Sequence, residues 1–478
     1  MTVPIGPAIA DNLTVSVDAF TGTEVVSGTF APTHEVWALT AARVGQAAKP
    51  LLPAVVDQAA WSCDQVGWGV VLPEPPGLSP AALATADDAP EPIQELVAAR
   101  HGKVLRYRTD SGFAAWTLRD YAGHGDLLNA MSPPGVGPKQ LPMYVLIYAG
   151  PTQIPWQLQY SLNPVRYVGR LDLEGEQLAN YVTALIGDWS DSKARYDSPV
   201  VWSVDLGGGD TDITTLMRET IAAPVHIRLS QDTDITGTRF IDGAATDATG
   251  QALAECLEQN KPYLVVTTSH GMTGPLNDHD AMRANLGMPV DQAGALVHPD
   301  RLLTKWQPDG AIWFAQACCS AGADSPSTYQ GLFESDSLLD RTLQAVASLG
   351  PMTSPLPREL LGAPKPLRAF VGHVEPTFNW TMSFPPNRQV LTSDLEEVLY
   401  SRLCLSQPVG LAMSPLYRPV GSLLIDHGRA VGTYDTSVQD AERRALDMAL
   451  YSKVVAYDRV GTVILGDPTA AIPLPKRP

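Results

Sequence analysis

Two residues of the sequence have the chemistry of a thiol nucleophile and of the imidazole that would serve it. His270 ends the apolar run 263–270, and Cys318 follows the apolar run 311–317. A cysteine attacks acyl carbon well when it is partly thiolate, and a nearby imidazole promotes that state. Because each residue ends a strand-like run, two neighbouring strands could hold the pair at one edge of a sheet.

The spacing of the pair fits one strand–helix–strand unit. Cys318 lies 48 residues after His270. Gly271 has no Cβ, so its backbone N–H could approach a developing oxyanion, and the N–H of Cys318 is the second candidate donor. In an extended strand Cys319 points away from Cys318. The sequence therefore predicts Cys318 as the nucleophile and Cys319 as a packed, structural thiol.

The elements that must position this pair alternate along the chain. This alternation predicts an α/β fold with a mostly parallel sheet covered on both faces. Sites in such sheets gather at the carboxyl ends of strands, where both His270 and Cys318 fall. The expected strands are 143–148, 200–205, 226–229, 263–270, 311–317, 367–372 and 461–466, and the expected helices are 174–189, 212–222 and 248–260.

Three regions are expected from the composition along the chain. Residues 1–135 form an N-terminal domain of unknown role, with a strand at 13–18 and exposed loops rich in proline. A turn-rich patch, residues 132–138, marks its end. Residues 136–195 form an α/β segment that precedes or extends the main sheet, and residues 196–478 form the catalytic domain.

The bulk composition limits the partners of the chain. Its net charge is −18, which opposes binding to nucleic acid and to anionic membranes and would attract a basic peptide. We read no signal peptide and no membrane-spanning run. Five cysteines without metal-ligand spacing favour a reducing compartment. We therefore expect a cytoplasmic protein that needs no metal and no cofactor.

The motifs around the pair resemble those of one clan of cysteine peptidases. A strand ending in His270-Gly271 and a later strand ending in Ala317-Cys318 is the pattern of caspases, legumain, separase, gingipains and the CHAT peptidases. Gln316-Ala317-Cys318 resembles the caspase motif, whose histidine lies roughly 50 residues upstream. Residues 317–322 are closer to the CHAT pattern, and residues 167–172 and 464–469 are similar to segments of CHAT and gingipain-like bacterial members.

The resemblance implies a caspase-like three-layer sandwich and an endopeptidase that works through a His/Cys dyad. Caspases carry Arg-Gly where this chain has Cys319-Ser320, so specificity for aspartate is not expected. In this clan the loop 50–60 residues before the histidine often meets the side chain of the substrate's P1 residue. Asp210 and Asp212 occupy that loop and would pair with P1 arginine or lysine. Gln316 is a further candidate for substrate binding, and such peptidases often act with a regulatory or effector protein.

Several alternatives stay open at this point. Asp210 or Asp212 could instead be the N-cap of a helix. His373 could be an alternative base, with Glu375 orienting it, or both could be wall structure near the site. At the level of function, the chain could be a catalytically silent caspase-like scaffold for protein–protein interaction, or an acyltransferase or amidase that uses the same dyad.

Overall fold

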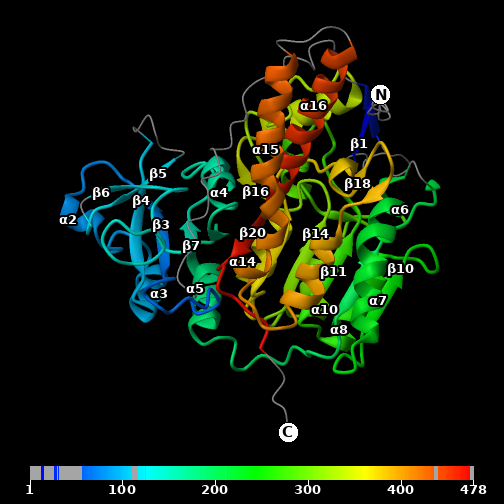
Figure 1. The fold of residues 1–478 in the computed structure, drawn as a ribbon. Coiled ribbons are helices and arrows are strands. Elements are labelled where there is room, and N and C mark those ends of the chain that lie inside the picture. The colour runs from blue at the N-terminus through cyan, green and yellow to red at the C-terminus, as the bar shows by residue number, and fades with distance from the viewer. Residues whose placement is uncertain are drawn as a thin grey trace.

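The structure is a computed structural model that describes residues 12–15, 26–29, 31, 56–109, 116–123, 125–209, 212–434 and 440–473. In these ranges twelve strands form one central sheet, so the chain has an α/β fold (Figure 1). In order across the sheet the strands are β10 (Arg239–Asp242), β9 (Val200–Ser203), β11 (Leu264–Thr268), β14 (Ile312–Gln316), β17 (Ala369–His373), β20 (Thr462–Gly466), β8 (Tyr167–Leu171), β7 (Tyr144–Tyr148), β3 (Trp68–Pro73), β4 (Lys103–Tyr107), β5 (Thr117–Asp120) and β6 (Gly125–Leu128).

The sheet has two halves whose strands run in opposite directions. Strands β10, β9, β11, β14 and β17 are parallel to one another. Strand β20 is antiparallel to β17 and parallel to β8, and β7, β3 and β4 continue that second direction. The hairpin β5–β6 closes the far edge. The carboxyl ends of the two halves therefore lie at opposite edges of the sheet.

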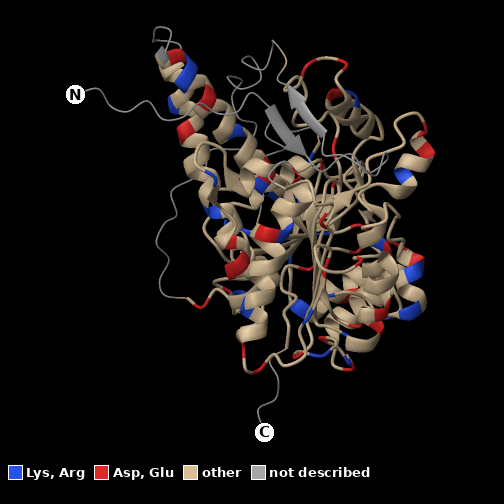
Figure 2. Ribbon diagram, turned by 90° about the vertical axis from the view of Figure 1, so that its right-hand side faces the viewer, with Lys and Arg blue, Asp and Glu red and all other residues tan. Residues whose placement is uncertain are grey.

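Alternating side chains of the central strands feed two separate cores. In β14, Trp313 and Ala315 join one apolar cluster, whereas Ile312 and Phe314 join the other. This period of two is what a strand buried on both faces requires. Figure 2 shows helices on either side of the strands, with the charged residues mostly on these helices and the loops.

The helices sort by the face that they cover. On the face of Trp313 pack α3 (Glu91–Arg100), α5 (Gly175–Ile186), α8 (Gly250–Asn260), α10 (Pro299–Lys305) and α12 (Pro355–Gly362). On the opposite face pack α6 (Ile213–Met217), η2 (Arg218–Ala222), α7 (Ala223–Gln231), α13 (Ser393–Glu396), η4 (Glu397–Arg402) and α14 (Val409–Ala412).

Two long helices near the C-terminus form a pair that lies against the sheet and extends beyond it. They are α15 (Ser414–Tyr434) and α16 (Asp440–Gly461), shown in orange and red in Figure 1. The last turn of α16 leads directly into β20. None of the helices in the described ranges combines the length and apolarity needed to cross a bilayer.

Apart from α11, the remaining elements are short. The helices are α2 (Pro80–Leu83), α4 (Trp156–Leu162), α9 (His279–Asn285), α11 (Leu338–Ser348) and η3 (Asn379–Thr381). The small two-stranded sheets are β1 (Asn12–Val15) with β2 (Val26–Thr29), β12 (His270–Gly271) with β13 (Pro289–Val290), β15 (Gly322–Ala323) with β16 (Met352–Thr353), and β18 (Ser383–Phe384) with β19 (Gln389–Val390).

Most of the predicted strands and helices are confirmed, with ends that shift by a few residues. One strand prediction is wrong: residues 226–229 lie inside helix α7. Pro224 stands in the first turn of that helix, and Val225 and Leu229, four residues apart, are its buried face.

A separate N-terminal domain is not confirmed, because strands β3 to β6, from residues 68–128, continue the central sheet.

Candidate functional site

The register of two adjacent strands brings His270 and Cys318 together. Strands β11 and β14 are parallel, and Thr268 is paired with Gln316. The N–H of Ser269 donates to the Gln316 carbonyl at 3.3 Å, which extends the ladder beyond β11. His270 and Cys318 therefore each lie two residues past a paired position, on strands about 4.8 Å apart.

Gly271 makes this close approach possible. A Cβ built on Gly271 would lie 1.9 Å from the carbonyl oxygen of Cys318 and 2.9 Å from its nitrogen. Any side chain at this position would therefore push the two strand ends apart. The structure thus places the backbone of the residue after the histidine directly against the backbone of the cysteine.

The thiol of Cys318 is enclosed. Cys318 is 0% exposed and His270 is 2% exposed. The backbone N–H of Thr377 lies 3.4 Å from Cys318 Sγ, and the carbonyl oxygen of Thr377 lies 3.8 Å from it. Aromatic and aliphatic side chains from three segments complete the enclosure, among them Tyr329, Leu332, Phe333, Leu339, Leu343, Phe378 and Trp380.

Cys319 faces another part of the molecule. It has a φ of 54° and packs with Met282, Leu286 and Val346 in a cluster that excludes Cys318. Burial is the main cause that raises the pKa of the Cys319 thiol well above its usual value. The two adjacent cysteines therefore have different surroundings, and Cys319 has the properties of a packed apolar residue.

Gln316 belongs to a buried polar network on the Cys318 side of the sheet. Its amide nitrogen donates to Thr377 Oγ1 at 3.3 Å, and its amide oxygen lies 3.3 Å from His373 Nε2. Thr377 Oγ1 in turn donates to Asp458 Oδ2 at 3.0 Å. Both amide atoms of Gln316 thus contact neighbouring side chains. Its expected role in substrate binding stays a prediction.

Burial shifts the acid–base properties of this network towards neutral forms. It raises the pKa of Asp458 to about 7 and lowers the pKa of His373 to about 3. Asp458 Oδ1 lies 3.6 Å from His373 Nδ1, so a charged pair could form on geometry alone. The desolvation cost of two buried charges exceeds their attraction here, and the uncharged pair is the favoured form between about pH 3 and pH 7.

Glu375 is a second buried carboxyl beside the cysteines. It is 2% exposed, and burial raises its pKa to about 7. Its carboxylate oxygens accept the N–H of Thr328 at 3.0 and 3.2 Å, and its carbonyl accepts the N–H of Cys319 at 2.8 Å. These bonds tie the loop after the cysteines to the end of β17. The carboxylate of Glu375 accepts the N–H of Thr328 in this structure. Its expected role in orienting His373 stays a prediction.

The acidic loop after β9 is described only in part. Asp212 is the N-cap of α6, where it accepts the backbone N–H and the hydroxyl of Thr214, both at 2.8 Å. Its carboxylate also accepts the N–H of Gly208 at 3.3 Å, and the residue is 4% exposed. Asp210 lies outside the described residues. Contact of either carboxylate with a substrate stays a prediction.

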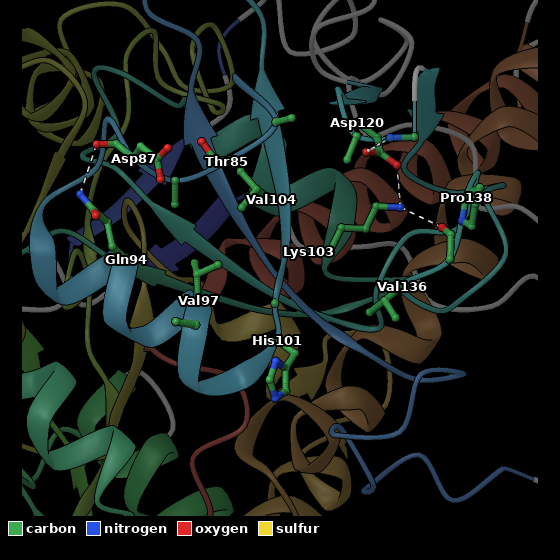
Figure 3. Close-up of a pocket in the computed structure, with 17 residues that line it drawn as sticks. Thr85, Asp87, Gln94, Val97, His101, Lys103, Val104, Asp120, Val136 and Pro138 are labelled. Atoms are coloured by element: carbon green, nitrogen blue, oxygen red, sulfur yellow. Dashed lines mark hydrogen bonds and ion pairs between the residues drawn. The ribbon is translucent and has the colours of Figure 1, made fainter. Parts of the chain in front are cut away.

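The main cavities among the described residues are lined by neither His270 nor Cys318. A cavity of about 590 Å³ lies between α3, β4 and the loop before β7, where Lys103 forms an ion pair with Asp120 at 2.7 Å (Figure 3). Asp87 adds a further carboxylate to the lining, the other walls are mostly small apolar residues, and no cysteine or serine is among the lining residues. Beside the thiol, the network around Asp458 lines a cavity of only about 20 Å³.

Two residues near the thiol have no signal in the sequence. Thr377 follows the end of β17, and Asp458 reaches it from the last turn of α16 across 81 residues of chain. Asp458 has the pattern of an ordinary polar residue in a helix, so only the folded chain reveals its partners.

Among the described residues, no group of three or more His, Cys, Asp or Glu side chains is arranged to hold a metal ion.

No protein-family model, no curated protein and no solved structure matches this chain.

Proposed function

We propose that this protein is a cysteine endopeptidase of the caspase-like type, with Cys318 as nucleophile and His270 as its acid–base partner. The observation that carries the proposal is the register of β11 and β14, with Gly271 packed against the backbone of Cys318. An adjacent imidazole is one way to activate a cysteine nucleophile, and the register supports His270 as that group.

The proposed reaction runs through an acyl-enzyme. The Cys318 thiolate attacks the scissile carbonyl, and the backbone N–H groups of Gly271 and Cys318 stabilise the oxyanion. His270 protonates the leaving amine, and in the second step it removes a proton from the water that releases the acid. The proton that leaves on the amine thus returns from water, and the chemistry requires no further reactant.

We propose cleavage after arginine or lysine. Asp210 and Asp212 lie in the loop expected to meet P1, and a carboxylate pairs with a guanidinium or ammonium group. The net charge of −18 supports attraction of basic substrates. Gln316 is proposed to contact the substrate once the site opens.

The setting proposed for this activity is the cytoplasm, with a protein or peptide substrate and a regulatory or effector protein as partner. All five cysteines are free thiols, including the adjacent Cys318 and Cys319. Free thiols in a chain of 478 residues are typical of a reducing compartment.

One observation favours the second candidate, a silent scaffold that binds proteins without cutting them. Cys318 is 0% exposed, and a nucleophile must be reached by its substrate. The peptidase proposal therefore requires that the segments over the thiol move when substrate binds. The scaffold requires no such movement.

A peptide library separates the two candidates. We expect the wild type to cut after Arg or Lys, Cys318→Ala and His270→Ala to lose at least about a hundredfold of this activity, and Cys319→Ala to retain it. Cleavage that survives Cys318→Ala would refute the mechanism. Absence of cleavage in every sequence context would favour the scaffold.

A further inference from the structure

The backbone of Thr377 contacts the sulfur of Cys318 through two atoms. Thr377 presents its N–H at 3.4 Å and its carbonyl oxygen at 3.8 Å from Sγ. A thiol can donate to that carbonyl, and a thiolate can accept from that N–H. The position of Thr377 therefore affects both protonation states of the proposed nucleophile.

The segment 377–381, which begins with Thr377, also covers the thiol. Phe378 and Trp380, from the same stretch of chain, belong to the apolar cluster around Cys318. If this segment shifts, the sulfur loses its backbone partners and its apolar cover at the same time. The thiol therefore depends on whatever fixes the segment.

Asp458 fixes it from the opposite side. Asp458 Oδ2 accepts the hydroxyl of Thr377 at 3.0 Å and the hydroxyl of Thr381 at 2.6 Å, so one carboxyl oxygen ties both ends of the segment. Asp458 itself is 2% exposed in the last turn of α16. Its other oxygen faces His373 at 3.6 Å, and neighbouring Arg459 is paired with Asp394 at 3.1 Å.

We propose that Asp458 is a positioning residue for the Cys318 thiol, which it holds in place and keeps covered through Thr377 and Thr381. Asp458 acts through these threonines and takes no part in bond making or breaking. Its effect on turnover rests on the peptidase function proposed above, whereas its effect on the thiol does not.

The test measures the thiol and the turnover separately. The folded protein is treated with iodoacetamide at pH 7.5, and mass spectrometry with fragmentation locates the label at Cys318 or Cys319. The releasing variants are Asp458→Ala and Thr381→Val, of which the second replaces one anchoring hydroxyl by a methyl group and leaves the carboxyl. The conservative variants are Asp458→Asn and Thr377→Ser, which keep an acceptor or a hydroxyl.

We expect Asp458→Ala to speed alkylation of Cys318 by at least about tenfold, because two hydrogen bonds to a buried carboxyl are lost. Thr381→Val should have a smaller effect in the same direction, and Cys319 should stay protected in both. Turnover of a substrate peptide should fall through kcat while the thiol becomes more accessible. The conservative variants should stay within about threefold of the wild type.

Unchanged alkylation of Cys318 in both releasing variants would overturn the proposal. Equal acceleration at Cys318 and Cys319 would also overturn it, because it would reveal general loosening of the fold. If the wild type cuts no peptide, the proposed peptidase function fails, and the alkylation rates alone still decide the role of Asp458.

Discussion

The two halves of the central sheet share one architecture and differ in the groups that lie at the carboxyl ends of their strands. In the half from β10 to β17, neighbouring strands lead into His270 and Cys318, which are both buried. In the half from β20 to β4, three strands end instead at a cavity of about 290 Å³ lined by Tyr148, Asp172 and Glu174. Parallel strands supply an edge where a site can form, and the proposed nucleophile lies at the edge of the first half.

The buried ionisable groups of the two halves differ in the pH range in which they titrate. Arg170 on β8 is 0% exposed, yet it donates to the carbonyls of Ala149 and Ile154 at 3.0 and 2.8 Å, and it stacks over the ring of Trp156. Such a group is fully used in holding the fold together. Burial lowers the pKa of Arg170 to about 10, so its guanidinium stays charged at neutral pH. Around Cys318, burial raises the pKa of Glu375 and Asp458 to about 7, which places their titration near neutral pH, as in many functional sites.

The largest expected effect on stability lies in the half from β20 to β4. Arg170→Met should lower the free energy of unfolding by about 3 kcal/mol, because several buried carbonyls would lose their donor. The rate at which iodoacetamide labels Cys318 should change little at temperatures where the variant stays folded. Urea unfolding and thiol labelling measure the two effects. A large change in Cys318 labelling of the folded variant would show that the two halves are coupled.

Ionisation of Glu375, in the half of the sheet that carries Cys318, should make the free energy of unfolding depend on pH. Its folded-state pKa of about 7 lies above the ordinary value of 4.5. The folded state therefore binds the extra proton, and its stability falls as the pH rises from about 4.5 through about 7. Glu375→Gln cannot ionise, so relative to the wild type it should gain on the order of 3 kcal/mol between pH 5 and pH 8.

This comparison must be made between variants because His373 acts in the opposite direction. Burial lowers the pKa of His373 to about 3, so its contribution to stability is lost as the pH falls below about 6.5. That contribution is common to the wild type and Glu375→Gln and cancels in the difference. A difference that stays constant from pH 5 to pH 8 would contradict the raised pKa of Glu375.

A pair of glycines gives the most closely matched comparison of the two halves. A Cβ on Gly271 would lie 1.9 Å from the carbonyl oxygen of Cys318, and a Cβ on Gly169 would lie 2.1 Å from that of Gly466. Both Gly→Ala variants should lose about 2 kcal/mol of stability through steric strain. Only Gly271→Ala should change the labelling rate of Cys318 and abolish peptide turnover. Equal effects on labelling would remove the distinction between the halves.

The smallest expected effect concerns the acidic loop. Asp212→Ala should cost about 1 kcal/mol as a lost N-cap, whereas Asp212→Asn should cost a few tenths. If Asp212 also meets a basic P1 side chain, Asp212→Asn should reduce turnover of arginine peptides far more than it reduces stability. Turnover that follows stability in both variants would assign Asp212 to capping alone.

The parts of the fold that could be predicted from the sequence are those with a local signal. Apolar runs predict strands such as β11 and β14 because both faces of these strands are buried. Helix α15 has no comparable signal, since Pro419 and several glycines suggest a break. Its packing against α16 overrides these local preferences.

For the candidate site, the sequence reveals the residues that end strands and not the residues that support them. His270 and Cys318 stand out because each ends an apolar run, and the tight approach of Gly271 follows from its lack of a side chain. Asp458 and Thr377 meet across 81 residues of chain. A contact of this kind depends on how α16 packs against the sheet, which no periodicity in the sequence encodes.

The most direct test of the proposed catalytic pair is to map a mechanism-based label. An acyloxymethyl ketone that carries P1 arginine or lysine is incubated with the wild type, His270→Ala, Cys318→Ala and Cys319→Ala. We predict one adduct on Cys318 Sγ, which is lost in Cys318→Ala, strongly reduced in His270→Ala and retained in Cys319→Ala. An adduct on Cys319, or no adduct with any P1 side chain, would contradict the central claim that His270 and Cys318 act together in catalysis.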